Sequence, residues 1–338
     1  MRCIIPAAGK GTRLRPHTNT KPKALLSLGN KPLISHILDS IIDAGIKDFV
    51  IIVGYEKEKL IDYIESNYNK TCNYTFVEQK HRRGLGHAIY TAADFLDGEP
   101  VLIALGDSLY ENSFSLMLDE YKKFSNWTGA ITVKSVTNPQ AYGIVTIKEN
   151  SNEVKELIEK PENPTSSLAI TGVYIIRDSL ELKNALKELI NSNKIGIGGE
   201  LQLTDALQIM VNKGLILGII DSGRWFDCGK KEALLAAHSY VLNKYKSSSI
   251  ESELNNTIVI PPIAIQTNCQ ISNSIVGPYV SIDKGTIVEK SILSSSIIGT
   301  GSRIFNANIH DSLIGDEVEL IGRGHDLNVG NHSKIQFY

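Results

Sequence analysis

The chain has 338 residues, 42% of them hydrophobic, and a formal net charge of −2. A nearly neutral chain has no global basic field, so we expect no nucleic-acid partner, and no apolar stretch approaches the roughly 18 residues that a membrane span needs. Four scattered cysteines without C-x-x-C spacing favour a reducing, cytoplasmic location over a disulfide scaffold or a zinc site.

Short apolar runs alternate with amphipathic segments in the first part of the chain. We predict strands at 2–5, 48–54, 74–79 and 101–107 and helices at 31–45, 57–67 and 86–96. This order requires an α/β fold with a Rossmann-like, mainly parallel sheet. Further strands at 129–136, 143–149, 154–161 and 167–176 have few helices between them. They predict a mixed extension of the sheet that walls one side of a pocket. We place this first domain at 1–246.

The composition changes after the polar linker at 246–256. Aliphatic residues then recur every five or six positions, with glycines between them: Ile265, Ile271, Val276, Ile282, Ile287, Ile292, Ile298, Ile304, Ile309 and Ile314. A helix cannot keep this period on one face, but each short strand of a parallel β-helix can contribute one inward aliphatic. We predict a β-helix domain at 257–338, with a sandwich of short strands as the alternative. Its open end coils predict a homo-oligomer.

The stretch "IPAAGKGTRLRPHTNTKPKALL" at 5–26 combines bare backbone with positive charge. The dinucleotide-binding pattern is incomplete, because Leu14 stands where a third small residue belongs and Pro16 disfavours a helix. The Walker order of glycine and lysine is absent as well. The backbone N–H groups around Gly9 and Gly11, with Arg13, can form a nest for a triphosphate. The alternative is a solvated turn.

Two aspartates from distant parts of the chain are candidate metal ligands. Asp107 ends the apolar run 101–107, and the carboxyl ends of parallel strands are where open α/β sheets bind ligands. Asp227 follows the apolar run 215–220. Two carboxylates can share one Mg²⁺ that bridges phosphate groups. The alternative for each aspartate is a turn or a helix cap.

The motifs resemble those of the sugar-1-phosphate nucleotidylyltransferases. The opening stretch is similar to the family signature G-x-G-T-R-(x)n-P-K. Other motifs follow in the family's order: "GLGHA" at 84–88, "LGD" at 105–107, "YGIV" at 142–145, "EKP" at 159–161, "TGVYI" at 171–175, "GELQLTDA" at 199–206 and "WFDCG" at 225–229. With its tail, the chain resembles the long form of glucose-1-phosphate thymidylyltransferase, which implies a nucleotidyltransferase domain followed by a left-handed β-helix.

The resemblance implies a reaction between a sugar-1-phosphate and a nucleoside triphosphate that releases pyrophosphate, and it assigns roles to individual residues. Arg13, Lys23 and Asp107 are the implied catalytic residues, and Asp107 and Asp227 are the implied Mg²⁺ ligands. The implied substrate-binding residues are Ala8, Gly9, Gly11, Thr12, Gln79, Gly84, Gly143, Glu159, Lys160, Thr171 and Gly172.

These substrate-binding residues divide by substrate. Gln79 and the 84–88 loop would recognise the base, Lys160 the sugar phosphate and Glu159 the sugar hydroxyls. Without the family, Glu159 and Lys160 are merely a charged pair, and Gly143 and Gly172 are β-bulge candidates. His87 is expected to pack at a helix start without a catalytic role.

Several alternatives stay open. Gly198, where thymidylyltransferases often carry an arginine, leaves the choice between dTTP and UTP open. Mannose-1-phosphate guanylyltransferase is the alternative within the class, and acetyl transfer by the tail, with His310 or His325 as base, is a second enzyme class. The third alternative is a regulatory subunit that binds sugar nucleotides without catalysis.

Overall fold

The computed structural model describes residues 1–68, 70, 72–192, 196–245, 249–323, 329–330 and 333–334. The chain forms two compact units: Met1–Ser27 with Lys31–Ala237, and Leu28–Asn30 with His238–Tyr338. Residues 246–248, at which the first domain is predicted to end, lie outside the described residues. The domain boundaries at 246 and 257 therefore stay predictions.

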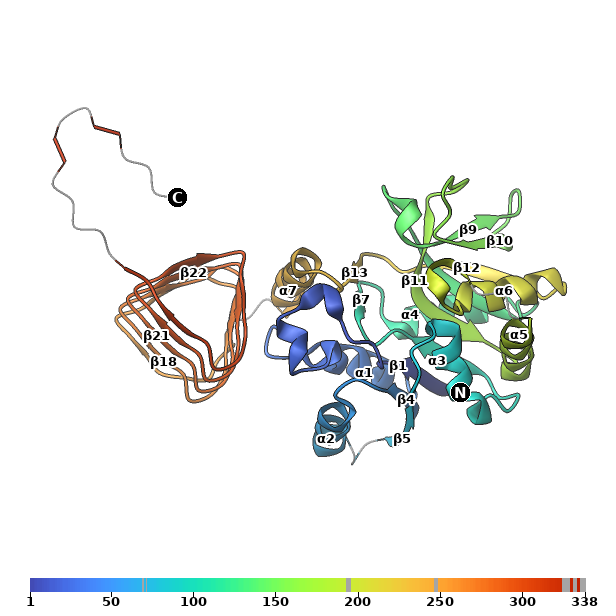
Figure 1. Cartoon of the computed structure of the whole chain (residues 1–338), viewed down its shortest axis with the longest axis horizontal. Coiled ribbons are helices and arrows are strands. Elements are labelled where there is room, and N and C mark those ends of the chain that lie inside the picture. The colour runs from blue at the N-terminus through green and yellow to red at the C-terminus, as the bar shows by residue number, and fades with distance from the viewer. Residues whose placement is uncertain are drawn as a thin grey trace. The chain divides into compact units, whose positions relative to one another are not determined.

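A nine-stranded mixed sheet is the centre of the first unit (Figure 1), in the order β10-β9-β11-β6-β1-β4-β5, with β8 paired to β11 and β12 paired to β8. The strands are β1 (Arg2–Pro6), β4 (Asp48–Val53), β5 (Asn73–Glu78), β6 (Val101–Ala104), β8 (Gly129–Ser135), β9 (Gly143–Ile147), β10 (Val154–Glu159), β11 (Leu168–Ile176) and β12 (Leu217–Asp221). Strands β6, β1, β4 and β5 are parallel, whereas β11 runs antiparallel to β6, β8 and β9. The predicted mainly parallel sheet and its mixed extension are confirmed.

Helices cover both faces of this sheet. The helices of this unit are α1 (Leu33–Asp43), α2 (Lys57–Tyr68), α3 (Leu85–Thr91), α4 (Phe114–Lys122), α5 (Ser179–Asn191) and α6 (Leu203–Asn212), and α7 (Lys231–Tyr245) continues from this unit into the second. Short strands β2 (Ser27–Leu28), β3 (Lys31–Pro32), β7 (Ser108–Tyr110) and β13 (Trp225–Asp227) and 3-10 turns at Thr12–Leu14, His17–Asn19, Lys23–Leu25, Ala93–Phe95, Pro139–Ala141 and Ile197–Gly199 complete the unit. The predicted helix at 86–96 ends early, and its last part is a 3-10 turn.

Alternating aliphatic residues divide between the two faces of the central strands. Ile4 of β1 and Ile52 of β4 pack against α3, α5 and α6 in one core, together with Ile89 and Leu207. Because successive side chains of a strand point to opposite faces, Ile5 faces the other side. All of these side chains are fully buried. This is why the predicted strands have continuous apolar sequences instead of an alternating pattern.

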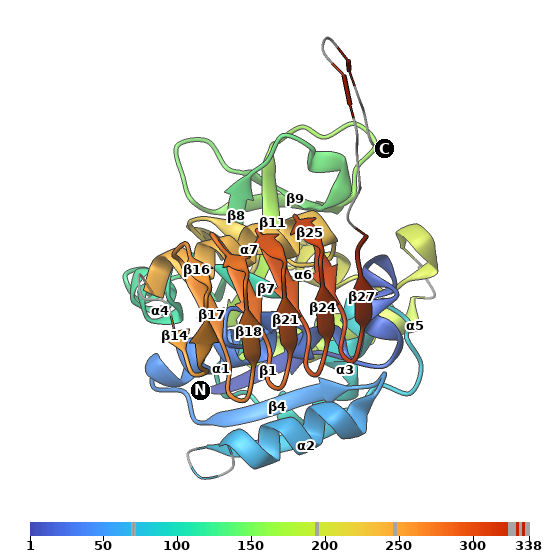
Figure 2. The ribbon, with the colours of Figure 1, turned by 90° about the vertical axis from the view of Figure 1, so that its left-hand side faces the viewer.

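The second unit stacks short strands into three parallel sheets (Figure 2), in the orders β14-β17-β20-β23-β26, β15-β18-β21-β24-β27 and β16-β19-β22-β25. The strands are β14 (Ser249–Ile250), β15 (Leu254–Asn255), β16 (Ile258–Val259), β17 (Ile263–Ile265), β18 (Gln270–Ser272), β19 (Ile275–Val276), β20 (Val280–Ile282), β21 (Ile287–Glu289), β22 (Ile292–Ser294), β23 (Ser296–Ile298), β24 (Arg303–Phe305), β25 (Asn308–His310), β26 (Leu313–Ile314) and β27 (Glu319–Ile321). This arrangement is that of a left-handed β-helix, and the predicted fold class is confirmed. A sandwich is excluded, because neighbouring strands are parallel at one coil's separation in sequence.

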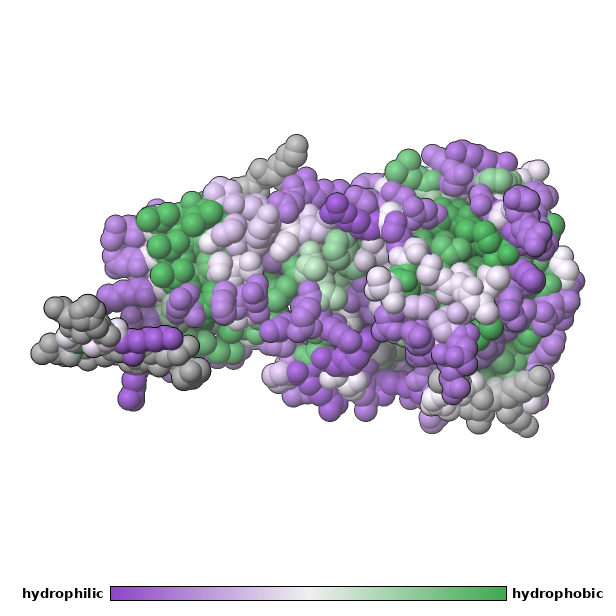
Figure 3. Space-filling view, turned by 90° about the horizontal axis from the view of Figure 1, so that it is seen from above, coloured by the Kyte–Doolittle hydropathy of each residue, from purple (hydrophilic) through white to green (hydrophobic). Residues whose placement is uncertain are grey.

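Two of the predicted inward positions are wrong. Ile292 is 45% exposed, and its neighbour Leu293 is fully buried instead; in the same way Val288, not Ile287, is fully buried. Adjacent residues of a strand face opposite ways, and both strands have two consecutive aliphatics, so the sequence period alone could not select between them. Ile258, Ile275 and Ile292 occupy matching positions on the neighbouring strands β16, β19 and β22. Figure 3 shows hydrophobic surface on this unit.

Candidate active site

Four charged side chains from three segments meet at the carboxyl end of the parallel strands. The Nζ atom of Lys23 lies 2.7 Å from Oδ2 of Asp107 and 3.8 Å from Oδ1 of Asp227. The Nη2 atom of Arg13 lies 3.8 Å from Oδ2 of Asp227. Lys23 is buried and both aspartates are partly exposed, so the pair of carboxylates faces solvent while the lysine supports it from the protein side.

A pocket of about 410 Å³ opens beside this cluster. It is lined by Pro6, Ala7, Gly9, Gly11, Thr12, Arg13, Lys23, Ala24, Gly106, Asp107, Glu200 and Gly229. A Cβ atom on Gly9 would meet no atom of the protein within 4 Å, so packing does not explain this glycine. An absent side chain at that point leaves the pocket and the backbone N–H groups open to a ligand.

The glycine-rich loop does not lead into an α-helix. Gly11 has a φ of +61°, and its carbonyl oxygen accepts hydrogen bonds from the Leu14 amide and, at 2.8 Å, from the Thr18 hydroxyl. The carbonyl oxygen of the neighbouring Ala8 accepts a hydrogen bond from Nε of Arg82. The loop is therefore held by its own short turns, as the incomplete dinucleotide-binding pattern and Pro16 indicated.

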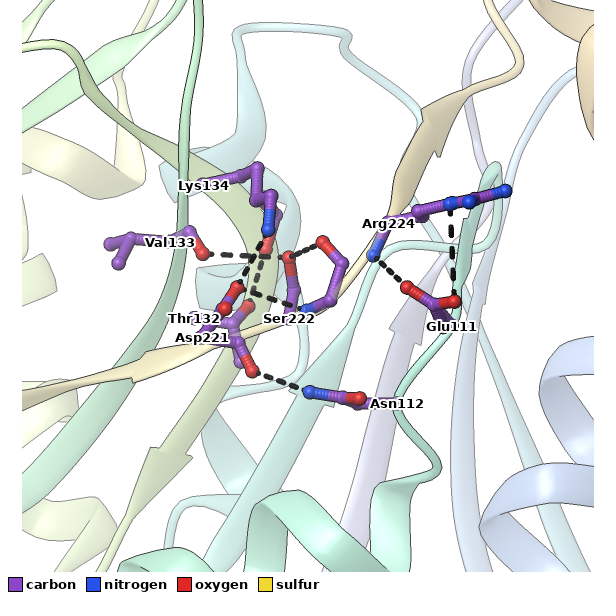
Figure 4. Close-up of polar contacts among 10 residues, drawn as sticks. Glu111, Asn112, Thr132, Val133, Lys134, Asp221, Ser222 and Arg224 are labelled. Carbon is purple, nitrogen blue, oxygen red and sulfur yellow. Dashed lines mark hydrogen bonds and ion pairs between the residues drawn. The ribbon is translucent and has the colours of Figure 1, made fainter.

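A two-stranded pairing explains how aspartates 120 positions apart come together. Strand β13 pairs antiparallel with β7, which places Asp227 opposite Ser108, and the Cys228 amide donates to the carbonyl of Asp107. Polar contacts attach the segment before β13 to the chain after β7 (Figure 4). Nδ2 of Asn112 donates to the Asp221 carbonyl at 3.0 Å, and the Arg224 amide donates to the Glu111 carboxylate at 2.9 Å.

Gly229 makes room for the arginine of the cluster. A Cβ atom at this position would lie 2.4 Å from Nη2 of Arg13 and 2.9 Å from Oδ1 of Asp227. Gly229 belongs to the "WFDCG" motif, but the sequence alone assigned it no role. Nor did it assign one to Glu200, which lines the pocket from "GELQLTDA". The sequence signal that could have found Gly229 and Glu200 is that each residue belongs to one of these two motifs.

The two carboxylates fit a magnesium ion by their chemistry. Mg²⁺ is usually bound by one or two carboxylates together with substrate phosphates, and not by a full protein cage. Asp107 and Asp227 share the neighbour Lys23, and both Lys23 and Asp107 line the pocket. Among the described residues, no group of three or more His, Cys, Asp or Glu side chains could hold a metal without such a substrate.

Glu159 belongs to a second group of contacts at the end of β10. Its Oε2 atom accepts a hydrogen bond of 2.7 Å from the Thr204 hydroxyl, and its Oε1 atom lies 3.7 Å from Nζ of Lys160. A Cβ atom on Gly143 would lie 2.9 Å from Oε2, so this glycine accommodates the carboxylate. Burial and then the nearby charge of Glu159 raise the pKa of Asp205. Thr204 is a further residue that the sequence alone did not single out.

Gly172 and Thr171 lie in β11 at an interruption of its pairing. The register with β8 shifts between Ile170 and Tyr174, and Gly172 has a φ of +101°, so the β-bulge interpretation describes this position. Thr171 is fully buried, and its hydroxyl lies 2.6 Å from that of Thr132. A role of Thr171 or Gly172 at the sugar stays a prediction.

Gln79 and Gly84 lie together beyond the end of β5. Nε2 of Gln79 donates to the Gly84 carbonyl at 3.2 Å and lies 3.2 Å from Nδ1 of His87. His87 is in the first turns of α3, as expected, and it contacts the residue that is predicted to recognise the base. Burial, followed by the positive charge of Arg83 and the proximity of His81, lowers the pKa of His87.

His310, one of the two candidate bases for acetyl transfer, is exposed on β25, whereas His325 lies outside the described residues. All four cysteines are buried and unpaired. No helix in the described part of the chain has the length and apolarity to cross a membrane.

Comparison with known sequences gives relatives of the first unit and of the whole chain. The chain is 35% identical over 260 residues to "Bifunctional protein GlmU" of Methanocaldococcus jannaschii, which covers 77% of this chain and 59% of that protein. It is 28% identical over 360 residues to a glucose-1-phosphate thymidylyltransferase of Streptomyces griseus, with 99% of each chain covered. The chain thus spans little more than half the length of this bifunctional relative but nearly the full length of the thymidylyltransferase.

Solved structures and a family profile agree with these relatives. A crystal structure of UDP-glucose pyrophosphorylase complexed with UDP-glucose is similar with a TM-score of 0.64 and 30% identity, covering 72% of this chain and 98% of that chain. The profile described as Nucleotidyl transferase matches residues 2–244, which include every residue of the charged cluster and its pocket. The chain therefore belongs to the nucleotidyl transferase family.

Proposed function

We propose that this protein is a Mg²⁺-dependent sugar-1-phosphate nucleotidyltransferase that joins glucose-1-phosphate to dTTP or UTP. The observation that carries the proposal is the cluster of Arg13, Lys23, Asp107 and Asp227 beside a glycine-lined pocket. The similarity to a thymidylyltransferase over its whole length and to a UDP-glucose pyrophosphorylase supports the choice of sugar and of a pyrimidine nucleotide.

The reaction needs two anions to meet in a fixed orientation. An oxygen of the sugar phosphate attacks the α-phosphorus of the triphosphate, a new P–O bond forms, and the bond to the β-phosphate oxygen breaks to release pyrophosphate. Arg13 and the N–H groups around Gly9 and Gly11 would bind the triphosphate and stabilise negative charge on the leaving group. Orientation by the pocket converts a reaction between two solutes into one within a single complex.

Asp107 and Asp227 would hold the magnesium ion. When bound, Mg²⁺ would supply positive charge to the phosphate oxygens. Lys23 would hold the two carboxylates in their orientation, because its buried ammonium lies within 3.8 Å of both. On the sugar side, Glu159 would accept hydrogen bonds from hydroxyl groups, and Thr204 would hold its carboxylate in place.

Pyrophosphate release from the purified full-length chain tests the proposal. The protein is mixed with glucose-1-phosphate and, separately, dTTP, UTP, GTP, ATP or CTP, with and without Mg²⁺. We expect release with dTTP or UTP that requires the metal. A preference for GTP would favour the guanylyltransferase alternative, and no release with any nucleotide would contradict the proposal for this sugar.

A second sugar substrate is considered because of the bifunctional relatives. The chain is similar to proteins named "Bifunctional protein GlmU" over 77% of its length. The same assay with N-acetylglucosamine-1-phosphate, and with mannose-1-phosphate as a comparison, decides which sugar phosphate is used. Consumption of acetyl-CoA with an amino sugar phosphate separately tests for acetyl transfer by the tail.

A further inference from the structure

The carboxamide of Gln79 is held from one side by two neighbours. Gln79 is 5% exposed, and its Nε2 atom lies 3.2 Å from the Gly84 carbonyl oxygen and 3.2 Å from Nδ1 of His87. A carbonyl oxygen can only accept a hydrogen bond. The NH₂ group of Gln79, and not its oxygen, must therefore face Gly84.

This orientation of the Gln79 carboxamide also defines the protonation state and tautomer of His87. One Nε2 proton of Gln79 points to Gly84, so the other faces Nδ1 of His87, which must then offer a lone pair. His87 is consequently neutral, with its proton on the other ring nitrogen. Burial and the neighbouring Arg83 and His81 lower the pKa of His87, which keeps the ring in this neutral form at pH 7.

The loop geometry fixes the position of the Gly84 acceptor. Gly84 has a φ of +102°, and a Cβ atom on it would lie 2.6 Å from the Leu201 carbonyl oxygen. The Leu201 amide in turn donates to the Arg83 carbonyl at 2.7 Å, and the Gly86 amide donates to the Leu201 carbonyl at 2.8 Å. These contacts hold the backbone around Gly84 in place, so the acceptor cannot turn away from Gln79.

We propose that His87 is a positioning residue that makes Gln79 an acceptor-only reader of the nucleotide base. This inference rests on the proposed function, in which Gln79 faces the base. With both Nε2 protons engaged by Gly84 and His87, only Oε1 of Gln79 is left for the base. Uracil and thymine offer an N3–H group to such an acceptor, whereas N3 of cytosine is itself an acceptor. His87 thus contributes to rejection of cytosine without touching the nucleotide.

The test compares UTP with CTP on the full-length protein. His87→Leu removes the acceptor and lets the Gln79 carboxamide rotate. We expect the ratio of kcat/KM for UTP to that for CTP to fall about tenfold or more, mainly through a higher KM for UTP. A purely structural loss would lower kcat/KM for UTP and kcat/KM for CTP by the same factor. His87→Asn, whose Oδ1 atom can accept near the place of Nδ1, should restore the ratio to within about threefold of wild type.

The outcomes separate this inference from the proposed function. An unchanged ratio in His87→Leu overturns the inference while the proposed function stands; His87→Ala replaces this variant if it does not fold. A wild-type protein without turnover on any sugar phosphate contradicts the proposed function. Equilibrium dialysis with UTP and CTP then still tests His87, because equal affinity of the wild-type protein for both nucleotides overturns the inference.

Discussion

Asp107 is the residue on which the proposed chemistry depends most directly. Its carboxylate contacts Lys23 at 2.7 Å and borders the pocket. Asp107→Asn keeps the shape but removes the charge, so we expect kcat/KM to fall by about 10²- to 10³-fold. Because the side chain is 42% exposed, the free energy of unfolding should change by less than about 1 kcal/mol. Turnover close to wild type would contradict a role of this carboxylate.

The Gly229→Ala variant tests whether triphosphate binding depends on the position of Arg13. In Gly229→Ala the new methyl group would occupy the place of the guanidinium, whose nearest atom would be 2.4 Å away. Arg13 is 58% exposed and can move aside, so we expect a stable protein with a KM for the nucleoside triphosphate about tenfold higher. Steady-state kinetics with both substrates varied measure this change.

Gly45→Ala serves as the control for a glycine replaced away from the pocket. Its Cβ atom would meet nothing within 4 Å, and Gly45 is not among the residues that line the pocket. Its φ of +86° means that alanine here lowers the free energy of unfolding, by about 1 kcal/mol, without displacing Arg13. This variant should keep the wild-type KM, so stability loss alone cannot explain a higher KM. An unchanged KM in Gly229→Ala would show that triphosphate binding does not depend on the observed position of Arg13.

At the scale of single elements, the sequence was most informative for strands buried on both faces and for amphipathic helices. The aliphatic runs of β1, β4 and β6 and the helical spacing in α1 predicted these elements because burial dictates their pattern. The pairing of β13 with β7, which joins Asp227 to the Asp107 segment, was not predictable, because a three-residue strand carries no periodic signal. The contact of Thr204 with Glu159 likewise depends on how α6 packs on β10.

Two isoleucines of the β-helix test which of its strand positions point into the core. Ile298 is fully buried, whereas Ile292 is 45% exposed. Replacing a fully buried isoleucine by alanine costs about 2–5 kcal/mol, so Ile298→Ala should lower the free energy of unfolding by that amount. Ile292→Ala should lower it by less than about 1 kcal/mol. Denaturant titration of this unit's transition compares the two, and equal losses would contradict the assigned phase.

For the whole molecule, the predicted homo-oligomer has a simple test. One chain has a mass of 37.1 kDa. Ile258 and Ile292 expose apolar surface in register on one sheet of the β-helix, which agrees with the prediction that this unit associates with other copies. Light scattering after size-exclusion chromatography should give a multiple of the chain mass. A monomer mass at micromolar concentration would contradict the prediction.

The central claim is that this chain transfers a nucleotidyl group to a sugar-1-phosphate at the cluster around Asp107. The most direct measurement is the fate of the α-phosphate: UTP or dTTP labelled there is incubated with glucose-1-phosphate and Mg²⁺, and the products are separated. We expect the label to appear in a sugar nucleotide, with an equal amount of pyrophosphate, and this transfer to be lost in Asp107→Asn. Label that stays in the triphosphate, or that transfers equally well in Asp107→Asn, would contradict the account.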